Sequence, residues 1–109
     1  AILNPMASFG GIYVPEALPR LDEEFFQAHI HSGYKALTRD LLARLGIDAE
    51  PEVIDRALAT YDAFDDPDDP VPVVEAGDGL YIGELYHGPT RAFKDMALQP
   101  FGVVLSALA

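Results

Sequence analysis

The residues best suited to chemistry are gathered in one short run, from Glu84 to Asp95. Within it, Gly88-Pro89 must end the strand-like stretch before it, because proline cannot donate a hydrogen bond to a strand ladder. Thr90 is a good N-cap residue, so we expect it to begin a helix whose first turn carries Lys94. Open α/β sheets bind their ligands at such turned junctions, at the carboxyl ends of strands.

Lys94 is the reactive group of this run and one of only two lysines in the chain. It lies between Phe93 and the apolar stretch 96–98, a setting that we expect to withdraw its amine from water. A desolvated amine is a good nucleophile towards a carbonyl carbon. A surface lysine at a helix start is the alternative, and these residues alone leave it open. We interpret Lys35, which lies opposite a leucine stripe, as a solvated surface residue.

Two other patterns imitate ligand-binding loops without meeting their requirements. Five aspartates lie between positions 62 and 69, but a calcium loop starting at Asp62 or Asp66 lacks the required Gly and Glu. We therefore predict an exposed acidic loop. Gly77-Asp78-Gly79, with Gly83 beyond it, is similar to a phosphate-binding loop, but its third glycine is misplaced and a strand follows it. This pattern predicts a hairpin turn.

The histidine pair offers no metal site. His29 and His31 are two positions apart, so on a helix they point to different faces and cannot easily share one ion. The chain has no cysteine, which excludes disulfides and thiolate ligands. We therefore predict no bound metal.

The acidic charge balance argues against partners that are themselves anionic. Seven Lys and Arg against eighteen Asp and Glu give a net charge of −11, which disfavours nucleic acids and anionic membranes. The longest apolar stretch, 101–109, is too short to span a bilayer, and no secretory signal is visible, so we expect a cytoplasmic protein. The non-Met start and the apolar helical pattern that stops at Ala109 predict a piece of a longer polypeptide.

Helices are expected on both sides of a strand hairpin. Asp22 is a predicted helix N-cap, and a leucine stripe followed by Gly46 predicts a second helix that ends there. Pro51 is a predicted first helical residue, and this helix and the leucine helix should form a helical hairpin. The remaining expected elements are a short strand at 12–14, two paired strands at 71–76 and 80–87, and a helix from about Ala92 that Pro100 should kink or delay.

Two separate motifs give the chain a family resemblance. His87-Gly88-Pro89-Thr90, continuing through Ala92-Phe93-Lys94-Asp95 into Ala97-Leu98-Gln99, resembles the pyridoxal-phosphate lysine motif of the threonine synthases. The entry Gly10-Gly11-Ile12-Tyr13-Val14-Pro15 is similar to the amino-terminal signature of the same family. The resemblance covers essentially the whole chain, with the intervening segments in the family's order.

The resemblance implies a lyase that uses pyridoxal 5'-phosphate to convert O-phospho-L-homoserine and water to L-threonine and phosphate. It implies that Lys94 forms the Schiff base with the cofactor, that Phe93 and Asp95 help to bind the cofactor, and that His87 and Thr90 contact the substrate. Arg91 is not assigned a substrate role, because the family often has an apolar or aromatic residue there. No metal is implied.

The implied fold class is α/β. A helix-rich amino-terminal region with a short β-hairpin, residues 1–75, leads into the start of a tryptophan-synthase-β-like cofactor domain, residues 76–109. The family's glycine-rich loop for the cofactor phosphate has no counterpart before Ala109, so we expect the chain to be inactive without the remainder of the enzyme. Two alternatives stay open: another lyase or dehydratase of the same cofactor group, and a non-catalytic threonine-synthase-like interaction domain.

Overall fold

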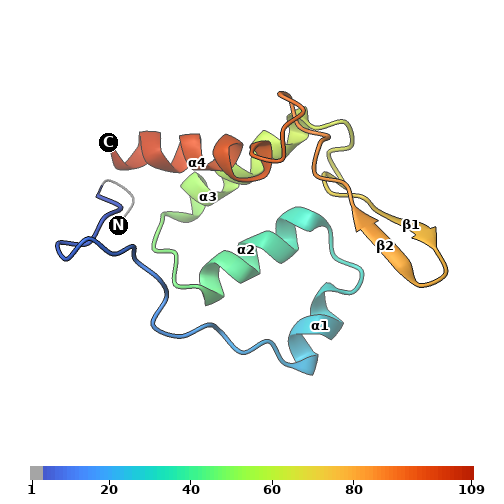
Figure 1. Cartoon of the computed structure of the whole chain (residues 1–109), viewed down its shortest axis with the longest axis horizontal. Coiled ribbons are helices and arrows are strands. Elements are labelled where there is room, and N and C mark those ends of the chain that lie inside the picture. Colours follow the sequence, from blue (N-terminus) through green and yellow to red (C-terminus); the bar gives the residue numbers. More distant parts are fainter. Residues whose placement is uncertain (1–3) are drawn as a thin grey trace.

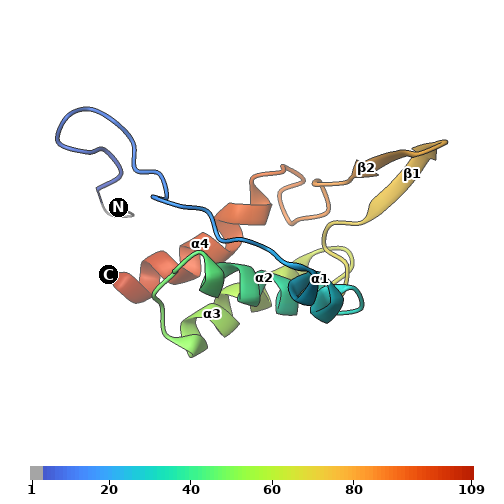
Figure 2. The same ribbon diagram turned by 90° about the horizontal axis from the view of Figure 1, so that it is seen from below.

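The computed structural model describes residues 4–109 and has a helical body from which one β-hairpin projects. Figure 1 shows this arrangement, and the view in Figure 2, turned by 90°, shows the same projection of the hairpin. In chain order the elements are α1 (Glu23–His29), α2 (Tyr34–Arg44), α3 (Pro51–Leu58), a 3₁₀ turn η1 (Ala59–Ala63), β1 (Val73–Gly77), β2 (Leu80–Gly83) and α4 (Asp95–Leu108).

The helix boundaries follow the signals in the sequence. The Asp22 side chain accepts a hydrogen bond from the Phe25 N–H at 3.0 Å, which confirms the predicted N-cap of α1. Gly46 has φ of +73° after α2, and the Ile47 N–H reaches back to the Leu42 carbonyl at 3.0 Å. This is the glycine-terminated helix end that the sequence predicts. Pro51 is the first residue of α3, as predicted.

The strands are shorter than the sequence suggests. β1 and β2 pair antiparallel around the turn 77–79, and Gly79 has φ of +74°, so the predicted hairpin is confirmed. Pro72 lacks an N–H and precedes the start of β1, while the chain leaves the ladder after Gly83. The predicted strand at 12–14 is reduced to one isolated bridge between Met6 and Ile12. Both faces of the hairpin are exposed.

The core lies where α3 and η1 meet α4. Its buried members are Ile54, Leu58, Tyr61 and Phe64, with Tyr34, Leu42, Ala49 and Met96 packed around them. The Tyr61 ring meets Phe64 and Tyr34 edge-on, with centroids 5.2 and 5.1 Å away. α3 packs more extensively against α4 than against α2, its expected hairpin partner.

Pro100 lies inside α4 and leaves one carbonyl of that helix without its usual donor. A proline at this position has no N–H for the Met96 carbonyl four residues earlier. The Tyr61 hydroxyl donates to this same carbonyl at 2.6 Å. Burial raises the pKa of Tyr61, so the hydroxyl keeps its proton. A side chain of the core therefore replaces the backbone hydrogen bond that Pro100 removes.

No helix in residues 4–109 combines the length and apolar character needed to cross a bilayer.

Tyr61→Phe should lower the free energy of unfolding by about 1–3 kcal/mol, because it leaves the Met96 carbonyl unpaired in the core. In a Pro100→Ala background the loss should shrink, since alanine at this position supplies the missing N–H. Tyr81→Phe, at a tyrosine that is 62% exposed on β2, is the matched control and should be neutral. Urea unfolding of these variants measures the coupling free energy between Tyr61 and Pro100. Equal losses of unfolding free energy from Tyr61→Phe with and without Pro100 would contradict this account.

Candidate active site around Lys94

Lys94 stands at the end of an irregular turn that precedes α4. The sequence predicts a helix from about Ala92 with Thr90 as its cap, and this is wrong: α4 begins at Asp95, and Lys94 occupies its N-cap position. Arg91 has φ of +63°, in the left-handed region that a helix cannot use. Its N–H donates to the Gly88 carbonyl at 3.1 Å, which closes a tight turn before the helix.

The carboxylate of Asp95 holds this turn together from within. Asp95 is 3% exposed; one oxygen accepts the Thr90 N–H at 2.8 Å and the other accepts the Gln99 side-chain N–H at 3.0 Å. Burial acts to raise the pKa of Asp95, but the hydrogen bonds from Gln99 and Thr90 outweigh it and hold the pKa below its ordinary value. Asp95 is therefore an ionised, fully engaged side chain inside the turn.

Gly88 is the residue that lets this carboxylate approach the turn. A Cβ added at Gly88 would lie 2.5 Å from the Asp95 Cβ and 2.5 Å from its Oδ2. Atoms this close overlap, so any larger residue must displace Asp95 or the backbone. The glycine is required here by close packing and not by its φ angle.

Gly88→Ala should cost roughly 1–3 kcal/mol of stability, because the new methyl group overlaps the Asp95 side chain. Gly83→Ala is the matched control, since a Cβ at the end of β2 meets nothing within 4 Å. Thermal unfolding of both variants measures the difference. A Gly88→Ala protein as stable as Gly83→Ala would show that the turn does not depend on this contact.

The Lys94 amine is exposed within this chain and has no ion-pair partner among the described residues. The expected withdrawal from water is therefore not provided by residues 4–109. Lys94 instead borders an open, mostly apolar cavity of about 690 Å³, which is also lined by Tyr34, Val71, Leu85, Phe93, Met96, Ala97 and Leu98. Phe93 is 65% exposed beside it. An exposed amine on the edge of an apolar cavity can react with a ligand placed there.

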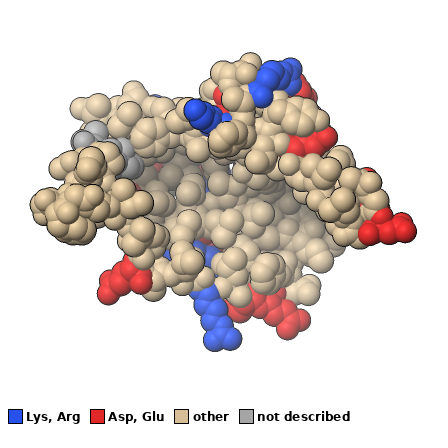
Figure 3. Space-filling model, in the orientation of Figure 1, with Lys and Arg blue, Asp and Glu red and all other residues tan. Residues whose placement is uncertain are grey.

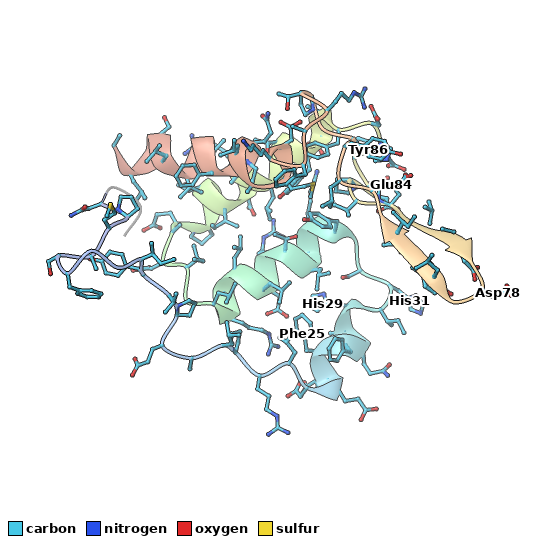
Figure 4. The ribbon with its side chains drawn as sticks, viewed as in Figure 1. Phe25, His29, His31, Asp78, Glu84 and Tyr86 are labelled. Carbon is cyan, nitrogen blue, oxygen red and sulfur yellow. The ribbon has the colours of Figure 1, made fainter. Side chains whose placement is uncertain are left out.

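His87, at the start of the turn, lies between two carboxylates. Its Nδ1 is 2.9 Å from Asp65 and its Nε2 is 3.0 Å from Glu84. Figure 4 shows Glu84 and the neighbouring Tyr86 at the base of the hairpin. Hydrogen bonds to Asp65 and Glu84 raise the pKa of His87, which favours the doubly protonated ring. Both ring nitrogens are thus occupied by partners within the chain.

The sequence analysis noted Asp65 in the acidic run and Glu84 at the start of the candidate run, but it did not assign either a contact with His87. The acidic run is exposed, as predicted, and the Asp66 carboxylate accepts the Asp68 N–H in a local turn at 2.9 Å. Asp65, however, also forms an ion pair with Arg91, and Arg91 and His87 lower the pKa of Asp65 to about 2. No pattern of spacing could pair a residue of this loop with a histidine 22 positions later.

The weaker candidates have structural roles. His29 Nε2 donates to the Asp40 carboxylate at 2.8 Å, and its Nδ1 lies 2.9 Å from the Ser32 hydroxyl, so His29 fixes α1 beside α2. Figure 4 shows its ring beside that of Phe25. Within the described part of the chain no three metal-binding side chains come together. Lys35, predicted to be solvated, is half-buried and forms an ion pair with Asp62.

The relatives of the chain include threonine synthases and a threonine synthase-like protein. No protein-family model matches the chain. Threonine synthase of Corynebacterium glutamicum is 37% identical over 108 residues, which are 93% of this chain and 22% of that protein. The threonine synthase of Saccharomyces cerevisiae is 37% identical over 115 residues, covering 94% and 21%. Mouse threonine synthase-like 2 is 36% identical over 104 residues, covering 90% and 21%.

A solved structure agrees with this result. The crystal structure of pyridoxal-phosphate-bound threonine synthase from Brucella melitensis superposes with a TM-score of 0.89 at 28% identity, over 98% of this chain and 23% of that one. The chain thus spans about a fifth of the length of the curated relatives that it matches. Residues 4–109 have the fold of the matching part of that α/β enzyme. The chain is a homologue of the threonine synthases and corresponds to their amino-terminal region.

Proposed function

We propose that the chain is the amino-terminal part of a cytoplasmic threonine synthase, a pyridoxal-phosphate-dependent lyase that converts O-phospho-L-homoserine and water to L-threonine and phosphate. The observation that carries the proposal is the position of Lys94, an exposed amine beside an apolar cavity, in a chain that superposes on a pyridoxal-phosphate-bound enzyme. The Lys94 side chain carries the amine nucleophile that reacts with an aldehyde such as that of this cofactor.

The residues around Lys94 fit the ring of the cofactor but not its phosphate group. The apolar cavity beside the amine is suited to a planar aromatic ring, and the exposed Phe93 supplies a ring surface next to it. The cavity lining contains no cation other than Lys94, so the cofactor phosphate needs groups from the rest of the enzyme. We therefore propose that the 109 residues alone do not form the complete cofactor site.

In this assignment Lys94 has two tasks. Its Nζ would hold the cofactor, and as a free amine it would move protons at the α- and β-carbons of the substrate. Bound pyridoxal phosphate supplies an electron sink for carbanions.

Of the residues near Lys94, we propose that one contacts the substrate and that two hold the turn in shape. Thr90 is exposed on the turn, and we propose that it contacts the substrate. The family resemblance implies that Asp95 binds the cofactor, but both of its oxygens are already engaged within the turn, so we propose that it acts by shaping that turn. The resemblance likewise implies that His87 contacts the substrate, and its two ring nitrogens are engaged in the same way. We propose a supporting role for it too.

We also propose a division of the chain near residues 75 and 76. Residues 1–75 form the amino-terminal region and residues 76–109 open the cofactor domain. β1 (Val73–Gly77) spans this boundary, so the hairpin connects the two parts.

Lys94→Ala in the complete protein should lose at least the roughly 10²–10⁴-fold that acid–base catalysis contributes to kcat, because both tasks use one amine. Borohydride reduction with the cofactor, followed by peptide mapping, should place a pyridoxyl group on Lys94. Lys35→Ala removes the other lysine of the chain and should keep the label and the activity. A label found elsewhere, or a Lys94→Ala protein with unchanged turnover, would refute the assignment.

The complete protein should release phosphate from O-phospho-L-homoserine and should not release ammonia from threonine at a comparable rate. Parallel assays of the two products separate a threonine synthase from a dehydratase of the same cofactor group. A protein that releases neither product and takes no pyridoxyl label would instead be a non-catalytic relative.

A further inference from the structure

The turn that presents Lys94 is tied to a segment far away in the sequence. Asp65, in the acidic loop after η1, lies with one carboxylate oxygen 2.9 Å from the His87 Nδ1 and forms an ion pair with Arg91. Its backbone N–H also donates to the His87 carbonyl at 3.1 Å. His87 and Arg91 stand on either side of the Gly88–Thr90 segment, so one aspartate contacts both ends of the turn.

The surroundings of His87 reinforce this connection. Its Nε2 faces Glu84 at 3.0 Å, and the Tyr86 hydroxyl donates to the same carboxylate at 2.7 Å. The Tyr86 ring also lies against the imidazole, with centroids 4.5 Å apart. Two carboxylates can only accept hydrogen bonds, so both ring nitrogens must donate, and the ring must be an imidazolium. His87 is thus a cation held between two acidic partners.

Arg91 needs Asp65 for a different reason. Its backbone has φ of +63°, a conformation that costs free energy for a residue with a Cβ. The ion pair with Asp65 holds the Arg91 side chain in place. Loss of Asp65 would therefore release the turn at the two places where its path is set.

We propose that Asp65 is a positioning residue for the reaction assigned to Lys94. Its contacts with His87 and Arg91, which we call the clasp, hold the acidic loop against the turn and so fix where the turn presents the amine. This inference rests on the function proposed above. Asp65 acts through the turn and does not itself touch the reacting atoms. The clasp is complete while His87 is protonated, and it weakens as the pH rises through the raised pKa of His87, because the neutral ring keeps only one N–H donor for its two carboxylate partners while the Asp65–Arg91 ion pair remains.

The test compares Asp65→Ala, Asp65→Asn and Asp65→Glu in the complete protein, with Asp68→Ala as the control in the same loop. The control removes an equal charge from an exposed aspartate outside the clasp. The pKa of His87 is measured by NMR on protein with labelled histidine. The kcat and KM for O-phospho-L-homoserine are measured against pH, and Lys94 labelling by borohydride is measured in parallel.

Asp65→Ala should lower the His87 pKa, move the alkaline limit of kcat to lower pH and reduce kcat roughly 10- to 100-fold, the scale for a misplaced reactive group. The KM should change much less. Asp65→Asn keeps the shape of the side chain but loses the charge, so it should lower the His87 pKa without unfolding the protein. Asp65→Glu should restore part of the activity, and Asp68→Ala should match the unsubstituted protein.

Two failures can be told apart. If the unsubstituted protein is active and labelled at Lys94 while Asp65→Ala or Asp65→Asn behaves like Asp68→Ala, the positioning role is overturned alone. If the unsubstituted protein shows neither label nor turnover, the proposed function fails and the positioning role fails with it.

Discussion

The buried carboxylate of Asp95 is the contact on which the candidate site depends. It takes the Thr90 N–H and the Gln99 side chain, and it fits only because Gly88 has no Cβ. An ionised group at this depth is stable only with such partners. The arrangement fixes the start of α4 at Asp95 and sets the direction in which Lys94 leaves the turn. The candidate lysine is therefore positioned by a neighbour that is buried away from any ligand.

The same helix is also fixed by the core, at its second residue. The Tyr61 hydroxyl binds the Met96 carbonyl that Pro100 leaves without a donor, and Met96 packs against the core cluster. Helix α4 is thus anchored by Asp95 at its first residue and by Tyr61 in its first turn. These two contacts hold the base of Lys94 against the protein, and its amine is left towards the open cavity.

The chain leaves an apolar surface open between its helices. Figure 3 shows a hollow whose visible surface is mostly uncharged, with acidic and basic side chains around its rim. An apolar groove lined by Leu42, Ile54, Leu58, Phe101 and Val104 continues between α2, α3 and α4. Exposed apolar surface of this kind is typical of faces that bind another protein segment, and the chain spans about a fifth of the length of the relatives that it matches.

The sequence by itself determined the local features: the Asp22 cap, the Gly46 helix end, the Pro51 helix start and the glycine turn of the hairpin. Each depends on one or a few adjacent residues, so a short window holds the information. It also singled out Lys94, through the run of residues around it. Only the tertiary structure decided that α4 starts at Asp95 and not near Ala92, that Tyr61 compensates for Pro100, and that Asp65 and Glu84 enclose His87. These outcomes depend on which distant groups meet in space, and hydrogen bonds between such groups leave no periodic trace in the sequence.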